Sequence, residues 1–124
     1  MTDLEYLKSF DVILPVWTMG QIDDNNWEIK NSKIGNLQEA IHSGVGLAGW
    51  HGGMTDAFRD NTNYQFLVGS QFVCHPGNFV DYEVNIIDKN HEIVDGIRDF
   101  KVFSEQYFLP VSYTHLTLPT TRCV

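Results

Sequence analysis

The chain has few basic residues and little cysteine, and each shortage excludes a class of protein. It carries 8 Lys and Arg residues against 16 Asp and Glu residues, which gives a formal net charge of -8. Nucleic acids and anionic membrane surfaces are bound through clustered Lys and Arg side chains, and the sequence has no such cluster, so neither is an expected partner. The two cysteines, Cys74 and Cys123, are too few for a disulfide framework.

Long apolar runs are also missing from the sequence. No stretch is long enough to span a bilayer, and the start of the chain is acidic where a signal peptide would be basic. The composition is that of a globular protein, with 43% hydrophobic and 13% aromatic residues. A length of 124 residues is enough for one domain at most. We therefore expect a cytoplasmic protein that acts on a small molecule, with homo-oligomerisation left open.

Apolar runs that alternate with a helical pattern predict an α/β fold with a parallel sheet. Residues 11–16 form a continuous apolar run, which is typical of a strand covered on both faces. Residues 23–43 are expected to form a helix, intact or broken, that ends at Gly44. Residues 45–50 are expected to form the next strand, which completes a strand–helix–strand unit of the parallel type. Shorter elements are expected as a helical turn near residues 4–10, helices at 56–61 and 64–68, strands at 71–74, 81–88 and 100–103, and a helical segment within 89–98.

His51 lies at the predicted corner between the strand at 45–50 and the polar residues that follow, and Gly52 and Gly53 come directly after it. Glycine reaches positive φ freely and lets the backbone turn sharply near a ligand. In open α/β folds such corners lie at the carboxyl edge of the sheet, where ligands bind. An imidazole there could serve as general acid, general base or metal ligand, or it could simply hydrogen-bond to the turn. We take His51 as the first candidate catalytic residue.

A second histidine raises the question of a metal. His75 precedes a predicted turn, and together with His51 and the carboxylate of Glu105 it would supply the ligands of an open zinc site. The spacing of these residues is not diagnostic of any metal motif. Zinc is therefore one hypothesis, and a protein without a cofactor is the other.

Four further side chains are candidates for contacting a substrate. Asp56 and Arg59 are three residues apart, so they form either a surface ion pair or a polar clamp for sugar hydroxyls. Trp17 and Trp50 follow the two predicted strands, where their rings could stack on a sugar face or pack in the core.

Cys74 is interpreted as a small buried residue, because nothing in its surroundings indicates a lowered thiol pKa.

Several motifs occur in one order along the chain: Trp17–Gly20, Gly46–Arg59, Tyr64–Gly69, His75–Gly77, Asp81-Tyr82, His91 with Gly96-Ile97, and Ser104–Tyr107. In the identity and order of these motifs the sequence resembles the ThuA-like (trehalose utilisation) family, whose fold is related to that of the class I glutamine amidotransferase domains. Two positions differ from the family pattern, since Ser70 replaces a glycine and Glu92 a proline.

The resemblance implies a flavodoxin-like parallel sheet with flanking helices and a role in the catabolism of trehalose or of a keto-disaccharide derived from it. It assigns Glu105 to catalysis beside His51, and His75 and Tyr107 to substrate binding. A glutamine amidotransferase is excluded, because Trp50 and His51 stand where a cysteine nucleophile would be needed. A non-catalytic carbohydrate-binding or regulatory module and a metal-dependent hydrolase are the alternatives.

The resemblance also predicts that the family domain is incomplete at both ends and occupies residues 1–109. Residues 110–124 are set aside from the fold prediction, because Val111–Thr120 can be written in codons that resemble a transposase sequencing adapter.

Overall fold

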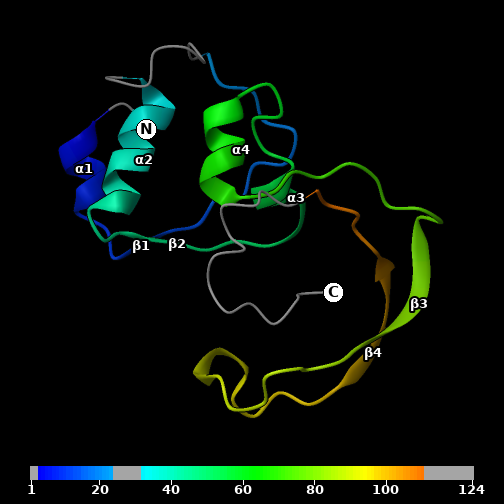
Figure 1. The fold of residues 1–124 in the computed structure, drawn as a ribbon. Helices are drawn as coiled ribbons and strands as arrows, with labels where there is room; N and C mark the ends of the chain where they lie inside the picture. The colour runs from blue at the N-terminus through cyan, green and yellow to red at the C-terminus, as the bar shows by residue number, and fades with distance from the viewer. Residues whose placement is uncertain (1–2, 24–31, 111–124) are drawn as a thin grey trace.

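The computed structural model describes residues 3–23 and 32–110, and its elements follow one another along the chain as Figure 1 shows. None of the helices described there is long and apolar enough to cross a membrane. The elements are α1 (Leu4–Lys8), β1 (Val12–Ile13), α2 (Lys33–His42), β2 (Gly46–Leu47), α3 (His51–Thr55), α4 (Thr62–Val68), β3 (Phe79–Val84), the 3-10 helix η1 (Glu92–Val94) and β4 (Phe100–Glu105).

A parallel strand pair joined by a helix forms the first half of the structure. β1 pairs with β2 in parallel, with Val12 opposite Gly46 and Ile13 opposite Leu47, and α2 lies between them along the chain. This confirms the predicted strand–helix–strand unit, although both strands are shorter than expected. Figure 1 shows α1, α2 and α4 on the same side of the two strands. In its described part the protein is thus a small α/β structure with a two-stranded parallel sheet.

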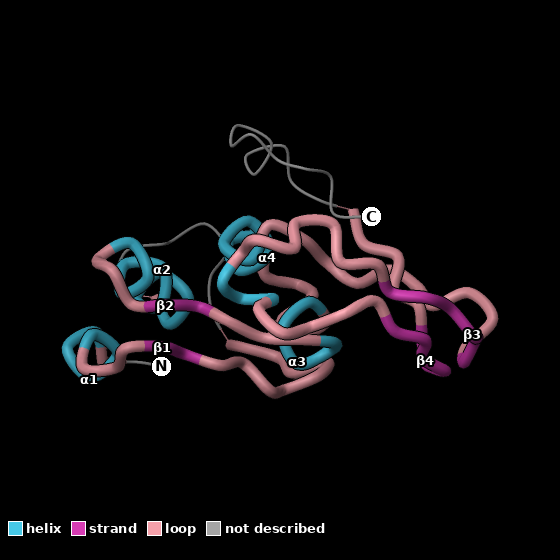
Figure 2. The backbone as a smooth tube through the Cα atoms, turned by 90° about the horizontal axis from the view of Figure 1, so that it is seen from below, coloured by secondary structure: helices cyan, strands magenta, loops and turns pink. Residues whose placement is uncertain are grey.

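The side of β1 away from the helices is exposed. Val12 and Leu14 are about half exposed, and Val16 keeps 71% of its surface accessible. The prediction that residues 11–16 are covered on both faces is therefore wrong, because α1, α2 and α4 pack on one side and Val12, Leu14 and Val16 remain exposed. Figure 2 shows the two strands from this uncovered side.

Helix α2 occupies the second part of the helix predicted for residues 23–43. Its N-cap is Ser32, whose hydroxyl accepts a hydrogen bond from the Gly35 amide at 2.9 Å, and this satisfies one of the free N–H groups of the first turn. The remainder of the predicted helix, residues 24–31, lies outside the described residues. At the other end Gly44 has φ 117°, a conformation that ends the helix and favours glycine, as predicted.

The core lies between α1, α2 and α4. Buried side chains come from α1, from one face of α2, from the residue before β2, from the loop before α4 and from α4 itself. They comprise Leu7, Ile34, Leu37, Ala40, Val45, Ala57, Phe58 and Tyr64. Among the described aromatic residues, Tyr64 is the most enclosed. It is 1% exposed, and its ring packs edge-on against Phe58 at a centroid distance of 4.9 Å. Its hydroxyl donates a hydrogen bond to the Met54 carbonyl at 3.0 Å.

Burial raises the pKa of Tyr64 to about 12 from an ordinary value of 10.0. Because the folded pKa lies above the unfolded one, the stabilising contribution is complete below pH 10 and is lost as the pH rises toward 12. We expect urea midpoints to fall over this range in the wild-type chain and to fall less in Tyr64→Phe, compared at matched pH. An equal fall in both chains would show that Tyr64 does not cause the alkaline loss.

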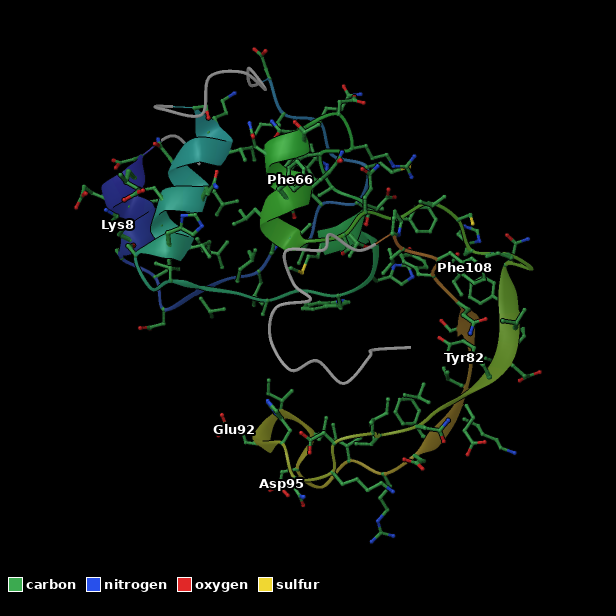
Figure 3. All side chains as sticks on the ribbon, viewed as in Figure 1. Lys8, Phe66, Tyr82, Glu92, Asp95 and Phe108 are labelled. Carbon is green, nitrogen blue, oxygen red and sulfur yellow. The ribbon has the colours of Figure 1, made fainter. Side chains whose placement is uncertain are left out.

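The hairpin β3–β4 forms a separate arm. Its strands are antiparallel, with Phe79 opposite Glu105 and Val84 opposite Phe100, and exposed and half-buried residues alternate along β3, as the predicted wetter face requires. Figure 3 shows Tyr82 along the arm, Glu92 and Asp95 at its far end, and Phe108 where the chain returns to the helices. The predicted helical segment within residues 89–98 is the short η1.

Two predicted elements differ from the structure. Residues 56–61 form turns rather than a helix, since Phe58 has φ 49°, a left-handed conformation that a right-handed helix cannot contain. Residues 71–74 make no ladder, and Cys74 forms only an isolated bridge to Phe108. Cys74 is also exposed rather than buried, because this segment runs over the surface toward the hairpin.

Candidate functional site

His51 stands at the predicted corner, as the first residue of α3 after the loop that leaves β2. The left-handed conformation at this corner belongs to His51 itself, with φ 52°, and not to the glycines. Gly52 and Gly53 serve close packing instead: an added Cβ would lie 2.7 Å from the Thr18 side chain and 3.0 Å from the Val16 backbone, respectively. The prediction that these glycines supply positive φ is thus wrong. Strained backbone of this kind is concentrated at functional sites.

A hollow of about 340 Å³ adjoins the corner, and His51 and Trp50 line it together with Pro15, Val16, Thr18 and Gly53. Three of these residues follow β1 and three follow β2, so the hollow lies at the carboxyl edge of the parallel pair, where open α/β folds bind ligands. The His51 side chain is 51% exposed. The imidazole is therefore not sealed in the core, and a ligand can reach it.

Both ring nitrogens of His51 meet residues from the end of the hairpin. Nε2 lies 3.0 Å from Oε2 of Glu105, the last residue of β4, and Nδ1 lies 2.9 Å from the Tyr107 hydroxyl. The His51 and Tyr107 rings are also in contact, with centroids 4.4 Å apart. Residues more than fifty positions apart thus form one group, and the return of the chain after β4 places them together.

His75 joins this group through an aromatic cluster. Its ring stacks on Phe72 at 5.6 Å, and Phe72 contacts the Tyr107 ring at 4.4 Å. His75 Nε2 is 3.9 Å from Oε1 of Glu105, which exceeds hydrogen-bond distance. Sequence reasoning missed Phe72, because an aromatic residue in a short apolar run carries no signal that distinguishes it from the core.

Asp56 and Arg59 form an ion pair at the edge of this cluster, through Arg59 Nε and an Asp56 carboxylate oxygen. Asp56 is only 3% exposed, so its carboxylate is held inside while the guanidinium remains partly accessible. Arg59 also lies over the Phe72 ring, with 5.7 Å from Cζ to the ring centroid. Of this predicted pair, Arg59 is therefore the side chain that a ligand can reach.

The loop that carries Asp56 is joined to the loop after β1. The Met19 amide donates to the Asp56 carbonyl, and the Phe58 amide donates to the Gly20 carbonyl, each at 2.9 Å. Met19, like Phe58, has a left-handed backbone. These paired bonds fix the position of Asp56 and Arg59 relative to the carboxyl edge of β1.

Burial and two nearby carboxylates favour the protonated form of the Tyr107 hydroxyl. Burial first, and then the negative charges of Glu105 and Asp56, raise the pKa of Tyr107, while the nearby charge of Arg59 acts in the opposite direction. The hydrogen bond to Asp56 in turn raises the pKa of Arg59 above its ordinary value. The site therefore presents a neutral phenol next to a fixed cation.

The two predicted tryptophans occupy different places. Trp50 lines the hollow beside His51 and is largely exposed, so its ring is available to a ligand. Trp17 instead packs edge-on against Phe58 at 6.2 Å and covers Gly20, where an added Cβ would lie 2.6 Å from its ring. Trp17 remains mostly exposed. It is not among the described residues that line the hollow, whereas its neighbour Thr18 is.

The structure brings His51, His75 and Glu105 near one another without grouping them as three metal ligands. Within residues 3–23 and 32–110, no three His, Cys, Asp or Glu side chains are grouped so that they could hold a metal ion. The Glu105 carboxylate instead lies against His51 at hydrogen-bond distance. The predicted zinc ligands are thus neighbours, but their geometry is that of a hydrogen-bonded pair.

Comparison with known proteins identifies the family. No significant match is found among curated proteins or among solved structures. The family model described as trehalose utilisation, ThuA, matches residues 1–122. The domain boundary expected after residue 109 stays a prediction, since residues 111–124 lie outside the described residues. The match confirms the resemblance on which Glu105 and Tyr107 were selected. The chain belongs to the ThuA (trehalose utilisation) family.

Proposed function

We propose that this protein is an enzyme of sugar catabolism in which His51 exchanges a proton with trehalose or with a keto-disaccharide derived from it. The observation that carries the proposal is the imidazole of His51, set between the Glu105 carboxylate at 3.0 Å and the Tyr107 hydroxyl at 2.9 Å on the wall of an open hollow. Membership of a family described as trehalose utilisation supports this choice of substrate class.

The Glu105 carboxylate supports an acid/base role for His51. A carboxylate that accepts the ring N–H orients the imidazole and stabilises the imidazolium that forms when the ring takes up a proton. General acid–base groups of this type contribute about 10²–10⁴-fold to a rate. Such a pair suits proton transfer at a hydroxyl, or at a carbon next to a sugar carbonyl.

The surroundings of His51 suit a carbohydrate. A volume of about 340 Å³ is at the lower end of small-molecule sites, and the exposed Trp50 ring offers the apolar platform on which sugar faces stack. We assign the polar contacts with hydroxyls to Arg59, His75 and Tyr107, with Asp56 holding Arg59 in place and Trp17 supporting the adjoining loop.

We extend the proposal to the fold of the family domain. The β1–α2–β2 unit, with its ligand hollow at the carboxyl edge, is the unit from which flavodoxin-like and amidotransferase-like sheets are built. We infer that the family domain extends this parallel pair into such a sheet.

A product assay tests the proposal. The chain is incubated with trehalose and, separately, with keto derivatives of trehalose, and the products are resolved by chromatography and mass spectrometry, with binding measured by calorimetry in parallel. We expect a keto-disaccharide or trehalose to be converted. Binding without conversion would indicate a carbohydrate-binding module instead, and the absence of both would overturn the proposal.

A further inference from the structure

We infer that Glu105 and Tyr107 hold neutral His51 as the tautomer protonated at Nε2, so that Nδ1 is the basic atom of the site and reaches the sugar through the Tyr107 hydroxyl. The inference rests on the proposed function for the sugar, while the tautomer follows from the geometry alone. It makes Tyr107 a catalytic residue that contacts the substrate, where the sequence had indicated only binding.

The Glu105 contact determines which ring nitrogen carries the proton. An ionised carboxylate can only accept hydrogen bonds, and Oε2 of Glu105 lies 3.0 Å from Nε2. Nε2 must therefore be the protonated nitrogen. In a neutral imidazole the other nitrogen, Nδ1, then carries a lone pair and can only accept.

The Tyr107 contact completes the arrangement. The hydroxyl oxygen lies 2.9 Å from Nδ1, and a neutral phenol is the donor that an unprotonated nitrogen requires. The raised pKa of Tyr107 agrees with a hydroxyl that keeps its proton. Once this proton is directed at Nδ1, the lone pairs of the phenol oxygen remain free to accept a hydrogen bond from a sugar hydroxyl.

This geometry defines a balanced proton transfer. The sugar O–H bond breaks with its electron pair left on the sugar oxygen, and the proton bonds to the Tyr107 oxygen. At the same time the Tyr107 O–H proton moves to Nδ1, so that Tyr107 is a neutral phenol before and after the step. His51 becomes an imidazolium whose charge lies beside Glu105. The reverse sequence returns a proton to an oxygen anion, and no other reactant is required.

The tautomer can be measured without any substrate. In the full chain labelled with ¹⁵N-histidine, at a pH where the ring is neutral, we expect Nε2 of His51 to resonate as a protonated nitrogen and Nδ1 as an unprotonated, hydrogen-bonded one. In Tyr107→Phe the Nδ1 resonance should shift toward that of a nitrogen without a donor. Tyr6→Phe, on the exposed helix α1, is the matched control and should leave it unchanged.

The same variants test the contact with the sugar. Tyr107→Phe should lower kcat by about 10²–10⁴-fold, while Tyr6→Phe should behave as the wild type. A proton on Nδ1 in the wild type, an unchanged Nδ1 resonance in Tyr107→Phe, or a kcat within tenfold of the wild type would each overturn the inference. If the wild type shows no turnover, the proposed function fails, and the tautomer measurement alone decides whether Glu105 and Tyr107 hold His51 in this way.

Discussion

Replacing His51 with asparagine is expected to lower turnover of the disaccharide substrate by about 10²–10⁴-fold while substrate affinity changes only a few-fold, because general acid–base catalysis contributes that much to a rate. Asparagine is chosen since His51 has φ 52°, and Asn is among the few residues other than glycine that adopt this conformation readily. The variant therefore removes the acid/base group with little new backbone strain. Steady-state kinetics and calorimetric titration measure the two effects.

His91→Asn is the matched control for this substitution. His91 is an exposed histidine at the N-cap of η1, where Nδ1 accepts a hydrogen bond from the Ile93 amide at 3.2 Å, and Asn can cap a helix equally well. Its turnover should equal that of the wild type. If His51→Asn retains turnover within tenfold of the wild type, His51 is not the proton-transfer group.

Replacing Leu37 with alanine is expected to lower the free energy of unfolding by about 2–5 kcal/mol, since deletion of a buried leucine side chain loses apolar burial and leaves a cavity. Leu37 is among the most buried side chains of the described residues and lies on the face of α2 that meets the core. The loss is a large fraction of the total stability of a small domain. Urea unfolding followed by circular dichroism gives the change in midpoint.

Ile93→Ala provides the comparison at the surface. Ile93 lies on η1 and is 77% exposed, so its truncation should change the free energy of unfolding by less than about 0.5 kcal/mol. Equal midpoints for Leu37→Ala and Ile93→Ala would contradict the packing of α2 against α1 and α4.

The sequence predicted the local elements better than their extent. Residues 45–50 were recognised as a strand from a short apolar run, residues 100–103 were recognised as a strand, and the end of α2 was recognised from Gly44, because each of these signals acts within a few residues. Local sequence signals could not show whether both faces of residues 11–16 are buried. An apolar run shows that a segment can be covered, but packing partners elsewhere in the chain decide whether it is.

The candidate site shows the same division between local and distant information. The corner position of His51 follows from its own neighbours, and the structure places it there. Its contacts with Glu105 and Tyr107 depend on the path of the hairpin β3–β4. The sequence grouped His51 with Glu105 only as possible zinc ligands, the family resemblance selected Tyr107, and neither predicted these contacts. Phe72 and the left-handed backbone of His51 and Phe58 had no sequence signal, since both arise from tertiary packing.

Contact between His51 and a carbohydrate is tested most directly by titrating the uniformly ¹⁵N-labelled chain with the keto-disaccharide and following the histidine ring and tryptophan indole resonances by NMR. We expect the His51 resonances to shift in a saturable manner together with the indole signal of Trp50, while those of His91 stay constant. Saturable binding that leaves the His51 and Trp50 signals unmoved would contradict a sugar site at this corner.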